Sequence, residues 1–312
     1  MIRALCLNPI IDRTYYIDDY QVGTKFMEIP SVCSAGGKGV NSARVMAQMG
    51  EPCVLYAFVG GAAGQMIVQD MESYGVEGVY FETRGETRTA IDIIDARNGR
   101  ETEIVEPGEE ITKEEEQAFF DRLEEDLRPG DIVICSGIRM PGMELSVFGE
   151  LARLAERKGA LCALDVDSKY FASSFPAKYF YAKPNLTELK RAFGIQGELT
   201  DKDMPALAKK VAELGVETFM ISQGGQGSLL FTGEGIFKAR IPKVNAVNTI
   251  GSGDSTVAGF CIGRARGLSV LECARLAMAC GISNAMHSQV GFVEKDQVEE
   301  LMERVTIEAF EG

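Results

Sequence analysis

The sequence predicts an α/β protein of three layers, in which helices cover both faces of a mostly parallel central sheet and a small second sheet stands apart. Two observations lead to this fold class. Apolar stretches of strand length alternate with stretches of helix length along most of the chain, which is typical of parallel sheets. Residues 88–106 break the alternation and form a hairpin pattern around the turn Asn98-Gly99.

The alternation gives each element an expected place. A buried strand at 2–7 is followed by the β-prone stretch 10–17 and by an exposed strand at 24–32. The next helix begins near Lys38 and ends at Gly50. Further strands are expected at 52–59, 78–82, 131–136, 161–166, 179–183, 217–222, 227–232 and 236–240. Further helices are expected at 62–75, 112–127, 144–158, 185–194, 201–214, 254–266, 269–287 and 295–309.

Composition excludes several classes of protein. The chain of 312 residues is 46% hydrophobic, so it can bury a large core, and no linker or repeat divides it into more than one expected domain. A net charge of −14 argues against a nucleic acid or an anionic membrane as the partner. None of the eight cysteines forms a Cys-x-x-Cys pair, no run reaches the roughly 20 apolar residues of a membrane span, and the N-terminal run is too short for a signal peptide. We therefore expect reduced thiols and a cytoplasmic protein.

The stretch 247–260 carries the sharpest chemical signal. Gly251 and Gly253 flank Ser252, Asp254 follows, and an apolar helical pattern begins there. The first amides of a helix lack internal partners and bind anions, and glycines let a ligand approach the backbone. Asp254 would stand beside a bound phosphate, where it could take a proton from an attacking hydroxyl. The alternative is a plain helix cap, with Ser252 or Asp254 as the N-cap residue.

Two stretches near the N-terminus have the character of ligand contacts. Asp12 lies just past the end of the first strand, where α/β proteins place such contacts, although it could be a turn residue. The run Gly36-Gly37-Lys38-Gly39 opens a helix whose first turn holds Asn41, a side chain that could bind a substrate hydroxyl. It is not a Walker P-loop, because the required spacing is absent and glycine follows Lys38.

Two later stretches each allow two interpretations. Asn185 follows Lys183-Pro184, and Glu188 lies three residues after Asn185. The spacing of Asn185 and Glu188 fits a capping box or a pair that holds Mg²⁺ through water. Ser222 to Gly227, with Gly224 between them, fits either a plain turn or a loop that passes close to a nucleotide. The single histidine, His287, lies late in an apolar helix, where a structural role is expected.

These motifs, in this order, resemble the phosphofructokinase B family of carbohydrate kinases, which has the ribokinase fold, and within it the branch of 1-phosphofructokinase and tagatose-6-phosphate kinase. The resemblance runs almost end to end. It implies a transferase that uses ATP and Mg²⁺, and a lid formed by segments of about 12–32 and 86–106 that covers the sugar and can also join two subunits in a homodimer.

The resemblance also implies roles for the motif residues. Asp254 would be the base, with the amides of Gly251, Ser252 and Gly253 around the transferred phosphoryl group. Asn185 and Glu188 would support Mg²⁺ through water. The nucleotide would lie by Lys183, Asn185, Glu188, Ser222, Gly224, Gly227 and Asn284. The acceptor sugar would lie by Asp12, Gly36, Gly37, Lys38, Asn41, Arg88 and Arg139.

The chain departs from that branch where the acceptor's own phosphate is bound. The branch usually has Asn-Arg where this chain has Phe26-Met27, and a serine where it has Ile138. Asp92 is gained, while Arg88 remains and Arg139 or Lys25 could compensate. Two hypotheses follow, a changed acceptor without phosphate or the branch's sugar phosphate held differently. A non-catalytic sugar- or nucleotide-binding regulator is a third, whereas the absence of a Gly-x-Gly-x-x-Gly after the first strand argues against a dehydrogenase.

Overall fold

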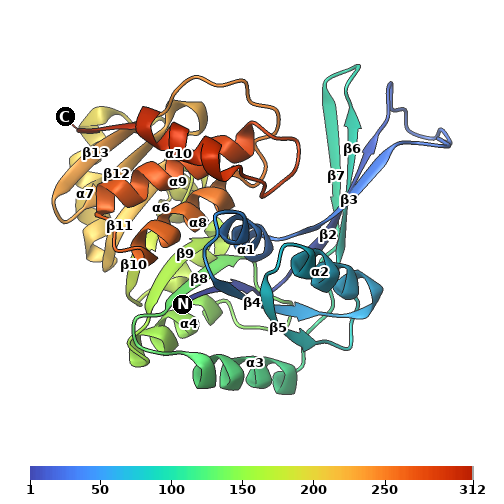
Figure 1. The fold of residues 1–312 in the computed structure, drawn as a ribbon, viewed down its shortest axis with the longest axis horizontal. Helices are drawn as coiled ribbons and strands as arrows, with labels where there is room; N and C mark the ends of the chain where they lie inside the picture. Colours follow the sequence, from blue (N-terminus) through green and yellow to red (C-terminus); the bar gives the residue numbers. More distant parts are fainter. Residues whose placement is uncertain (311–312) are drawn as a thin grey trace.

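A ten-stranded sheet forms the centre of the computed structural model, which describes residues 1–310 (Figure 1). Its strand order is β14-β13-β12-β11-β10-β9-β8-β1-β4-β5. The parallel part contains β1 (Ile2–Cys6), β4 (Cys53–Val59), β5 (Glu77–Glu82), β8 (Ile132–Gly137), β9 (Leu161–Val166), β10 (Tyr179–Ala182) and β11 (Val216–Ser222). Antiparallel pairings add β12 (Ser228–Thr232), β13 (Gly235–Arg240) and β14 (Thr306–Ala309) at one edge.

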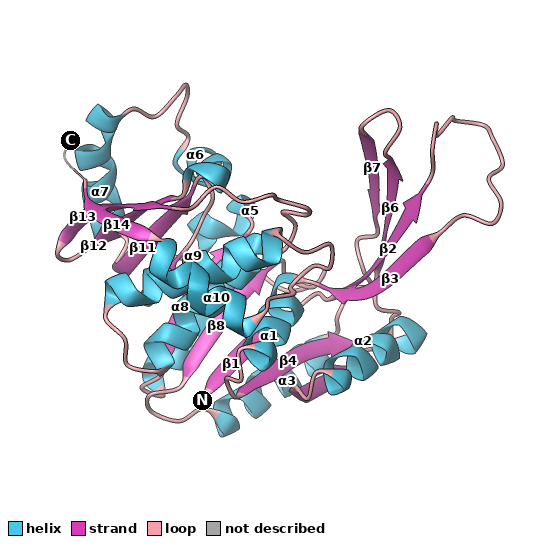
Figure 2. Ribbon diagram, turned by 45° about the horizontal axis from the view of Figure 1, so that its top comes forward, coloured by secondary structure: helices cyan, strands magenta, loops and turns pink. Residues whose placement is uncertain are grey.

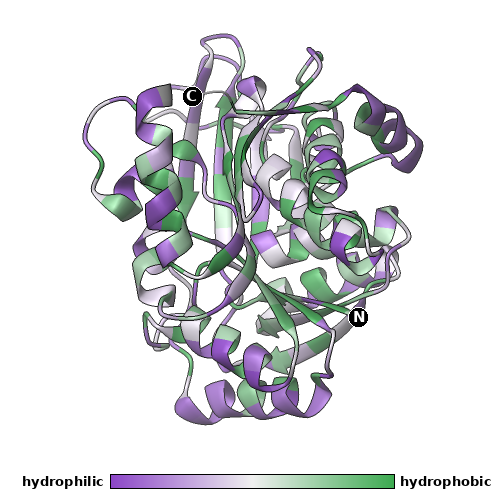
Figure 3. Ribbon diagram, turned by 90° about the vertical axis from the view of Figure 1, so that its left-hand side faces the viewer, coloured by the Kyte–Doolittle hydropathy of each residue, from purple (hydrophilic) through white to green (hydrophobic). Residues whose placement is uncertain are grey.

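Helices cover both faces of this sheet and close a separate apolar core on each (Figure 2). One face carries α1 (Lys38–Gln48), α2 (Gly61–Ser73), α8 (Ser252–Ala265), α9 (Val270–Ala285) and α10 (Lys295–Arg304). The other carries α3 (Lys113–Asp126), α4 (Val147–Arg157), α5 (Ser168–Phe171), α6 (Leu186–Phe193) and α7 (Met204–Glu213). Short 3₁₀ turns lie at Ala172–Ser174, Asp201–Asp203 and Gly224–Gln226. The strands of the main sheet are apolar and the outward faces of the helices are polar (Figure 3), as a three-layer fold requires. The predicted fold class is confirmed.

The small sheet projects from the main body as a separate arm (Figure 1). It contains β2 (Ile10–Tyr16), β3 (Ser31–Gly36), β6 (Thr89–Asp95) and β7 (Arg100–Val105), in the order β3-β2-β6-β7. The predicted hairpin forms β6 and β7, and β6 lies parallel to β2. We call this four-stranded sheet the lid.

Two predicted elements are wrong in position. The strand expected at 24–32 is displaced to Ser31–Gly36, because the segment before it contains Pro30, which has no amide hydrogen, and Glu28 with a φ of 55°. The helix expected at 295–309 ends at Arg304, and Thr306–Ala309 instead pair with β13 as an edge strand.

Two predictions from composition can be compared with the described residues. All eight cysteines are free, and seven of them are buried, which fits reduced structural thiols. Within residues 1–310, no helix combines the length and the apolarity that crossing a bilayer demands.

Candidate active site

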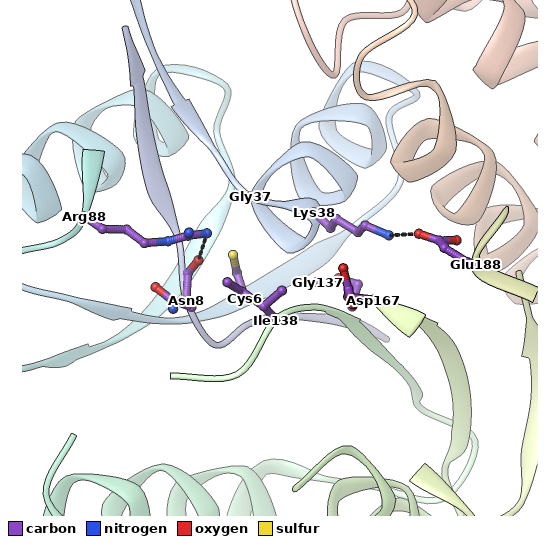
Figure 4. A pocket seen from close by; sticks show the side chains of 10 residues that line it. Cys6, Asn8, Gly37, Lys38, Arg88, Gly137, Ile138, Asp167 and Glu188 are labelled. Carbon is purple, nitrogen blue, oxygen red and sulfur yellow. Dashed lines mark hydrogen bonds and ion pairs between the residues drawn. The ribbon is translucent and has the colours of Figure 1, made fainter. Parts of the chain in front are cut away.

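A cavity of about 180 Å³ opens where the parallel strands end, beside the base of the lid. Its walls come from segments far apart in the sequence, and Figure 4 shows Arg88 beside Asn8 at one end and Lys38 pointing toward Glu188 at the other. The lining residues are Cys6, Asn8, Gly37, Lys38, Arg88, Ser136, Gly137, Ile138, Asp167 and Glu188. A ligand site at the carboxyl ends of parallel strands is the position that this architecture favours.

Asp254 lies in the first turn of α8, beside α1. The N-cap residue is Gly251, in the left-handed conformation with φ of 79°, and no side chain caps the helix. The interpretation of Ser252 or Asp254 as the N-cap is therefore wrong. The amide of Ser252 donates to the carbonyl of Thr249 at 3.3 Å, whereas those of Gly253 and Asp254 have no partner among the described residues and remain available to an anion. The carboxylate of Asp254 instead accepts a 2.8 Å hydrogen bond from Nδ2 of Asn41.

Asp254 is only 7% exposed, and this burial has the largest effect on the pKa of its carboxyl group. Burial raises the pKa of this carboxyl to about 6, and the charge of Asp165 acts in the same direction. Lys38, the hydrogen bond from Asn41 and Lys183 oppose the rise. A carboxylate with a pKa near 6 is ionised at neutral pH and still able to accept a proton in a reaction.

Asp165 at the end of β9 holds the two lysines of the site. Its Oδ1 lies 3.1 Å from Nζ of Lys38 and 3.6 Å from Nζ of Lys183. Burial alone would raise the pKa of Asp165, but the two ammonium groups outweigh it and hold the pKa below its ordinary value. Asp165 was not among the predicted site residues, although a carboxylate in a strand of otherwise apolar residues was a usable signal.

The lysines point toward the start of α8. A Cβ at Gly253 would lie 3.2 Å from Nζ of Lys183, so glycine leaves room for the ammonium group beside the helix. Lys38 and Lys183 thus place two positive charges near the amides of the first turn. Such a cluster can neutralise the oxygens of a phosphoryl group.

Asn284 supports the loop that begins α8. Its Nδ2 donates to the carbonyl of Ile250 at 2.8 Å and to Oγ of Ser252 at 3.1 Å, and its Oδ1 accepts from the amide of Gly291 at 2.7 Å. The residue is completely buried. Its observed contacts are therefore with the protein, and a contact with the nucleotide stays a prediction.

Asn185 and Glu188 form the capping box of α6, because each side chain accepts a 2.8 Å hydrogen bond from the other's backbone amide. The box uses only Oε2 of Glu188. Its Oε1 lies 3.9 Å from Nζ of Lys38 and faces the cavity. Asp165 also has a buried oxygen, Oδ2, that finds no hydrogen-bond partner within residues 1–310. These oxygens are of the kind that Mg²⁺ prefers, so the donor set fits this ion.

Ser222, Gly224 and Gly227 lie at the same edge of the sheet, since Ser222 ends β11 and pairs with Asn185 in an isolated bridge. Gly227 is required by its surroundings: its φ is 92°, and a Cβ would lie 2.0 Å from the carbonyl oxygen of Ala239. A Cβ at Gly224 would meet no atom within 4 Å. The loop therefore presents an open surface beside α6.

Most of the predicted sugar residues meet near the cavity. A Cβ at Gly36 would lie 2.0 Å from Oδ2 of Asp12, so glycine is needed for the carboxylate to lie there. At Gly37, with φ of 104°, a Cβ would contact Sγ of Cys6 at 2.8 Å.

The two predicted arginines differ in position. Arg88 lines the cavity and donates to the carbonyl of Asn8 at 3.1 Å. Arg139 does not line it, because its guanidinium donates to the carbonyl of Met140.

Acidic side chains extend from Asp12 along the lid. Asp92 on β6 stands directly opposite Glu103 on β7 in the strand register. Burial raises the pKa of Asp12 to about 6, with the charges of Asp92 and Glu103 adding to the rise while Arg88 and Arg44 oppose it. The lid thus brings negative charge close to the expected sugar position.

Comparison with known proteins agrees with this geometry. Residues 7–295 match the model of the pfkB family of carbohydrate kinases. A tagatose-6-phosphate kinase from Staphylococcus epidermidis is 30% identical over 98% of this chain and 99% of its own length. A 1-phosphofructokinase from Bacillus subtilis is also 30% identical, with the same coverage. The structure of phosphofructokinase-2 from Escherichia coli superposes with a TM-score of 0.89 over 97% of this chain and 98% of that one, at 23% identity, and so shares the fold.

Proposed function

The chain belongs to the pfkB family of carbohydrate kinases, and we propose that it transfers the γ-phosphate of ATP to a hydroxyl of a sugar or polyol that carries no phosphate of its own. The buried carboxylate of Asp254 at the uncapped start of α8 is the observation that carries the transfer. It combines a base with the free amides of Gly253 and Asp254 in one helical turn.

The steps follow from these positions. The acceptor hydroxyl gives its proton to Asp254 as its oxygen attacks the γ-phosphorus, and the bond from that phosphorus to the bridging oxygen of ADP breaks. The amides at the start of α8, together with Lys38 and Lys183, stabilise the charge on the moving phosphoryl group. Asn41 orients the carboxylate of Asp254 through its hydrogen bond. The lid excludes water, which would otherwise take the phosphoryl group.

Glu188 and Asn185 are the residues that would hold Mg²⁺ through water. The ion supplies charge neutralisation for the nucleotide phosphates when it is bound. The nucleotide itself would extend from α8 along the open loop from Ser222 to Gly227, since this loop borders Asn185.

The charge balance around the cavity supports an acceptor without phosphate. Its walls contain two cations, Lys38 and Arg88, and two carboxylates, Asp167 and Glu188. Lys38 is already paired with Asp165. A phosphate dianion is usually held by several charge-assisted hydrogen bonds, whereas here Asp12 and Asp92 add further negative charge. Ile138 contributes an apolar surface that suits a sugar carbon skeleton.

A phosphorylated acceptor is the second candidate, and Arg88 is the observation that favours it. Among the described residues, Nε of Arg88 is buried without a hydrogen-bond partner, so this guanidinium has a free donor at the cavity. The two curated relatives named above are both sugar-phosphate kinases. In this case the phosphate would lie on Arg88.

The discriminating experiment measures ADP release with MgATP against a matched panel. It pairs D-fructose, D-tagatose and D-mannitol with D-fructose 1-phosphate and D-tagatose 6-phosphate, and uses Asp254→Asn as the blank. Turnover confined to the uncharged acceptors supports the proposal. Turnover of a sugar phosphate at micromolar KM, abolished by Arg88→Gln, supports the second candidate. Silence with every acceptor, despite binding of MgATP, would favour a regulatory binding protein.

We also propose that the protein acts in the cytoplasm and that two lids join in a homodimer. Val32 and Ile104 on the lid are 55% and 54% exposed, which is unusual for large apolar side chains on a projecting sheet. Light scattering of the wild-type protein and of the double variant Val32→Ser with Ile104→Ser distinguishes a lid-mediated dimer from a monomer.

A further inference from the structure

Arg44 is a buried cation in the middle of α1. The residue is 1% exposed, and its neighbours Ala43 and Val45 belong to the apolar core. A buried guanidinium is costly unless its donors find acceptors and its charge finds a partner. The contacts of Arg44 therefore show what the fold gains from this side chain.

Four acceptors from four parts of the chain surround the guanidinium. One terminal nitrogen donates to Oδ1 of Asn41 at 3.1 Å and to the carbonyl of Val290 at 3.0 Å. The other donates to the carbonyl of Ala35 at 2.8 Å and to Oδ2 of Asp70 at 2.6 Å. Ala35 belongs to lid strand β3, Asp70 to α2, and Val290 to the segment between α9 and α10.

The first of these contacts determines how Asn41 faces Asp254. A guanidinium can only donate hydrogen bonds, so the atom of Asn41 that faces it must be the carbonyl oxygen. The amino group of Asn41 then has to point the other way, where it donates to Oδ2 of Asp254. Arg44 thereby fixes the orientation of an amide that could otherwise turn over.

The second contact reaches the loop that begins α8. Val290 and Gly291 pack against Gly251, where a Cβ would lie 2.7 Å from Cγ1 of Val290 and 2.9 Å from the amide nitrogen of Gly291. By holding the carbonyl of Val290, Arg44 holds the surface on which the N-cap residue of α8 rests. The hydrogen bond to the carbonyl of Ala35 also holds β3, the lid strand that ends at Gly36.

We propose that Arg44 is a positioning residue for phosphoryl transfer, which orients Asn41 toward Asp254 and ties lid strand β3 to the start of α8. This inference rests on the proposed function, because it takes Asp254 as the base. Arg44 itself touches neither the acceptor nor the nucleotide.

The role has a consequence for the pH dependence of the reaction. Asp254 faces Lys38 and Asn41 from α1, Asp165 from β9 and Lys183 from the segment after β10. Of these, the amide of Asn41 depends on Arg44 for its orientation. Loss of that orientation removes a hydrogen bond to the ionised carboxylate, so the pKa of Asp254 rises further.

The test is Arg44→Lys, assayed with MgATP and the panel acceptor of highest turnover. A lysine keeps the charge beside Asp70 but cannot bond all four acceptors. We expect kcat to fall by about 10- to 100-fold, as misplacement of catalytic groups produces, with the KM for ATP changed by less than about threefold. The acid limb of the kcat profile should move to higher pH by about half a unit or more.

The matched control is Arg266→Lys, which also removes an arginine that bonds to two parts of the chain, but at the C-terminal ends of α8 and α1. Arg266 donates to the carbonyl of Met49 and pairs with Glu51, and it has no contact with Asn41. The control should keep the wild-type kcat and acid limb. An Arg44→Lys protein that folds and retains both would overturn the proposal.

Should Arg44→Lys fail to fold, Asp70→Asn replaces it, because Asp70 is partly exposed and anchors the same guanidinium. A fall in kcat with an upward shift of the acid limb supports the inference, and a wild-type profile refutes it. Failure of the kinase activity on which this inference rests is distinct, since wild-type protein would then release no ADP with any acceptor, whereas a phosphorylated acceptor would change the assay substrate and leave the test of Arg44 the same.

Discussion

Replacing Asp254 by Asn should greatly reduce turnover and at the same time stabilise the fold. Burial raises the pKa of this carboxyl from 3.8 to about 6. Each pH unit corresponds to about 1.4 kcal/mol, so keeping the carboxylate ionised at pH 8 lowers the free energy of unfolding by roughly 3 kcal/mol. Asn removes the charge and still accepts the hydrogen bond from Asn41. The amino group of the new Asn side chain must also find an acceptor. We therefore expect the free energy of unfolding at pH 8 to rise by about 1–3 kcal/mol.

The sign of the effect changes with pH in a defined way. A carboxyl whose pKa is raised by folding binds its proton more tightly in the native state. The penalty in the wild-type protein is therefore present above pH 6 and fades as the pH falls through 6 toward 4. Urea denaturation of the wild-type protein and of Asp254→Asn at pH 8 and at pH 5 measures this penalty. The kcat of Asp254→Asn should be about 10²- to 10⁴-fold below that of the wild type. A variant that is less stable at pH 8, or whose advantage is equal at both pH values, would refute this account of Asp254.

The remaining predictions concern the same site. The kcat of the wild-type protein should decline as the pH falls through about 6, because Asp254 must be ionised to accept a proton; a profile flat to pH 5 would exclude it as the base. Asp165→Asn should lower the free energy of unfolding at pH 7 by about 2 kcal/mol or more, since it leaves the buried ammonium group of Lys183 without its counter-ion and weakens the pairing of Lys38; equal urea midpoints would contradict this. Gly36→Ala should raise the KM for the acceptor at least tenfold but leave the KM for ATP unchanged, because the new methyl group displaces Asp12. Gly233→Ala, where a Cβ meets no atom within 4 Å, is its control.

The sheet was predictable because its signals are local. Strand after strand of apolar residues, each followed by a helical pattern, leaves few alternatives to a parallel sheet. Where the evidence is not local, prediction failed. Thr306–Ala309 follow a helical pattern without a break, and only the exposed edge of β13 turns them into a strand. Ser31–Gly36 are a strand because β2 lies beside them.

The candidate site shows the same division. Gly251, Gly253 and Asp254 could be identified because the geometry they need is written in adjacent residues. The charges of Asp165 and Arg44 inside apolar stretches were visible in the sequence, but their contacts could not be predicted, since the partners of each lie far away along the chain. The single side chain of Arg44, for example, bonds to Ala35, Asp70 and Val290, which lie in three separate parts of the chain. No periodicity reveals such a convergence before the chain has folded.

The bond between Asn41 and Asp254 joins residues 213 positions apart. On a ribosome that adds about 5–20 residues per second, α1 emerges about 10 to 40 s before the carboxylate it will contact. A nascent chain can complete the lid and several strands of the sheet in that interval, yet it holds no base. With Asp254 as the proposed base, an unfinished polypeptide is expected to consume no ATP, and the appearance of turnover during translation would report that synthesis has passed α8.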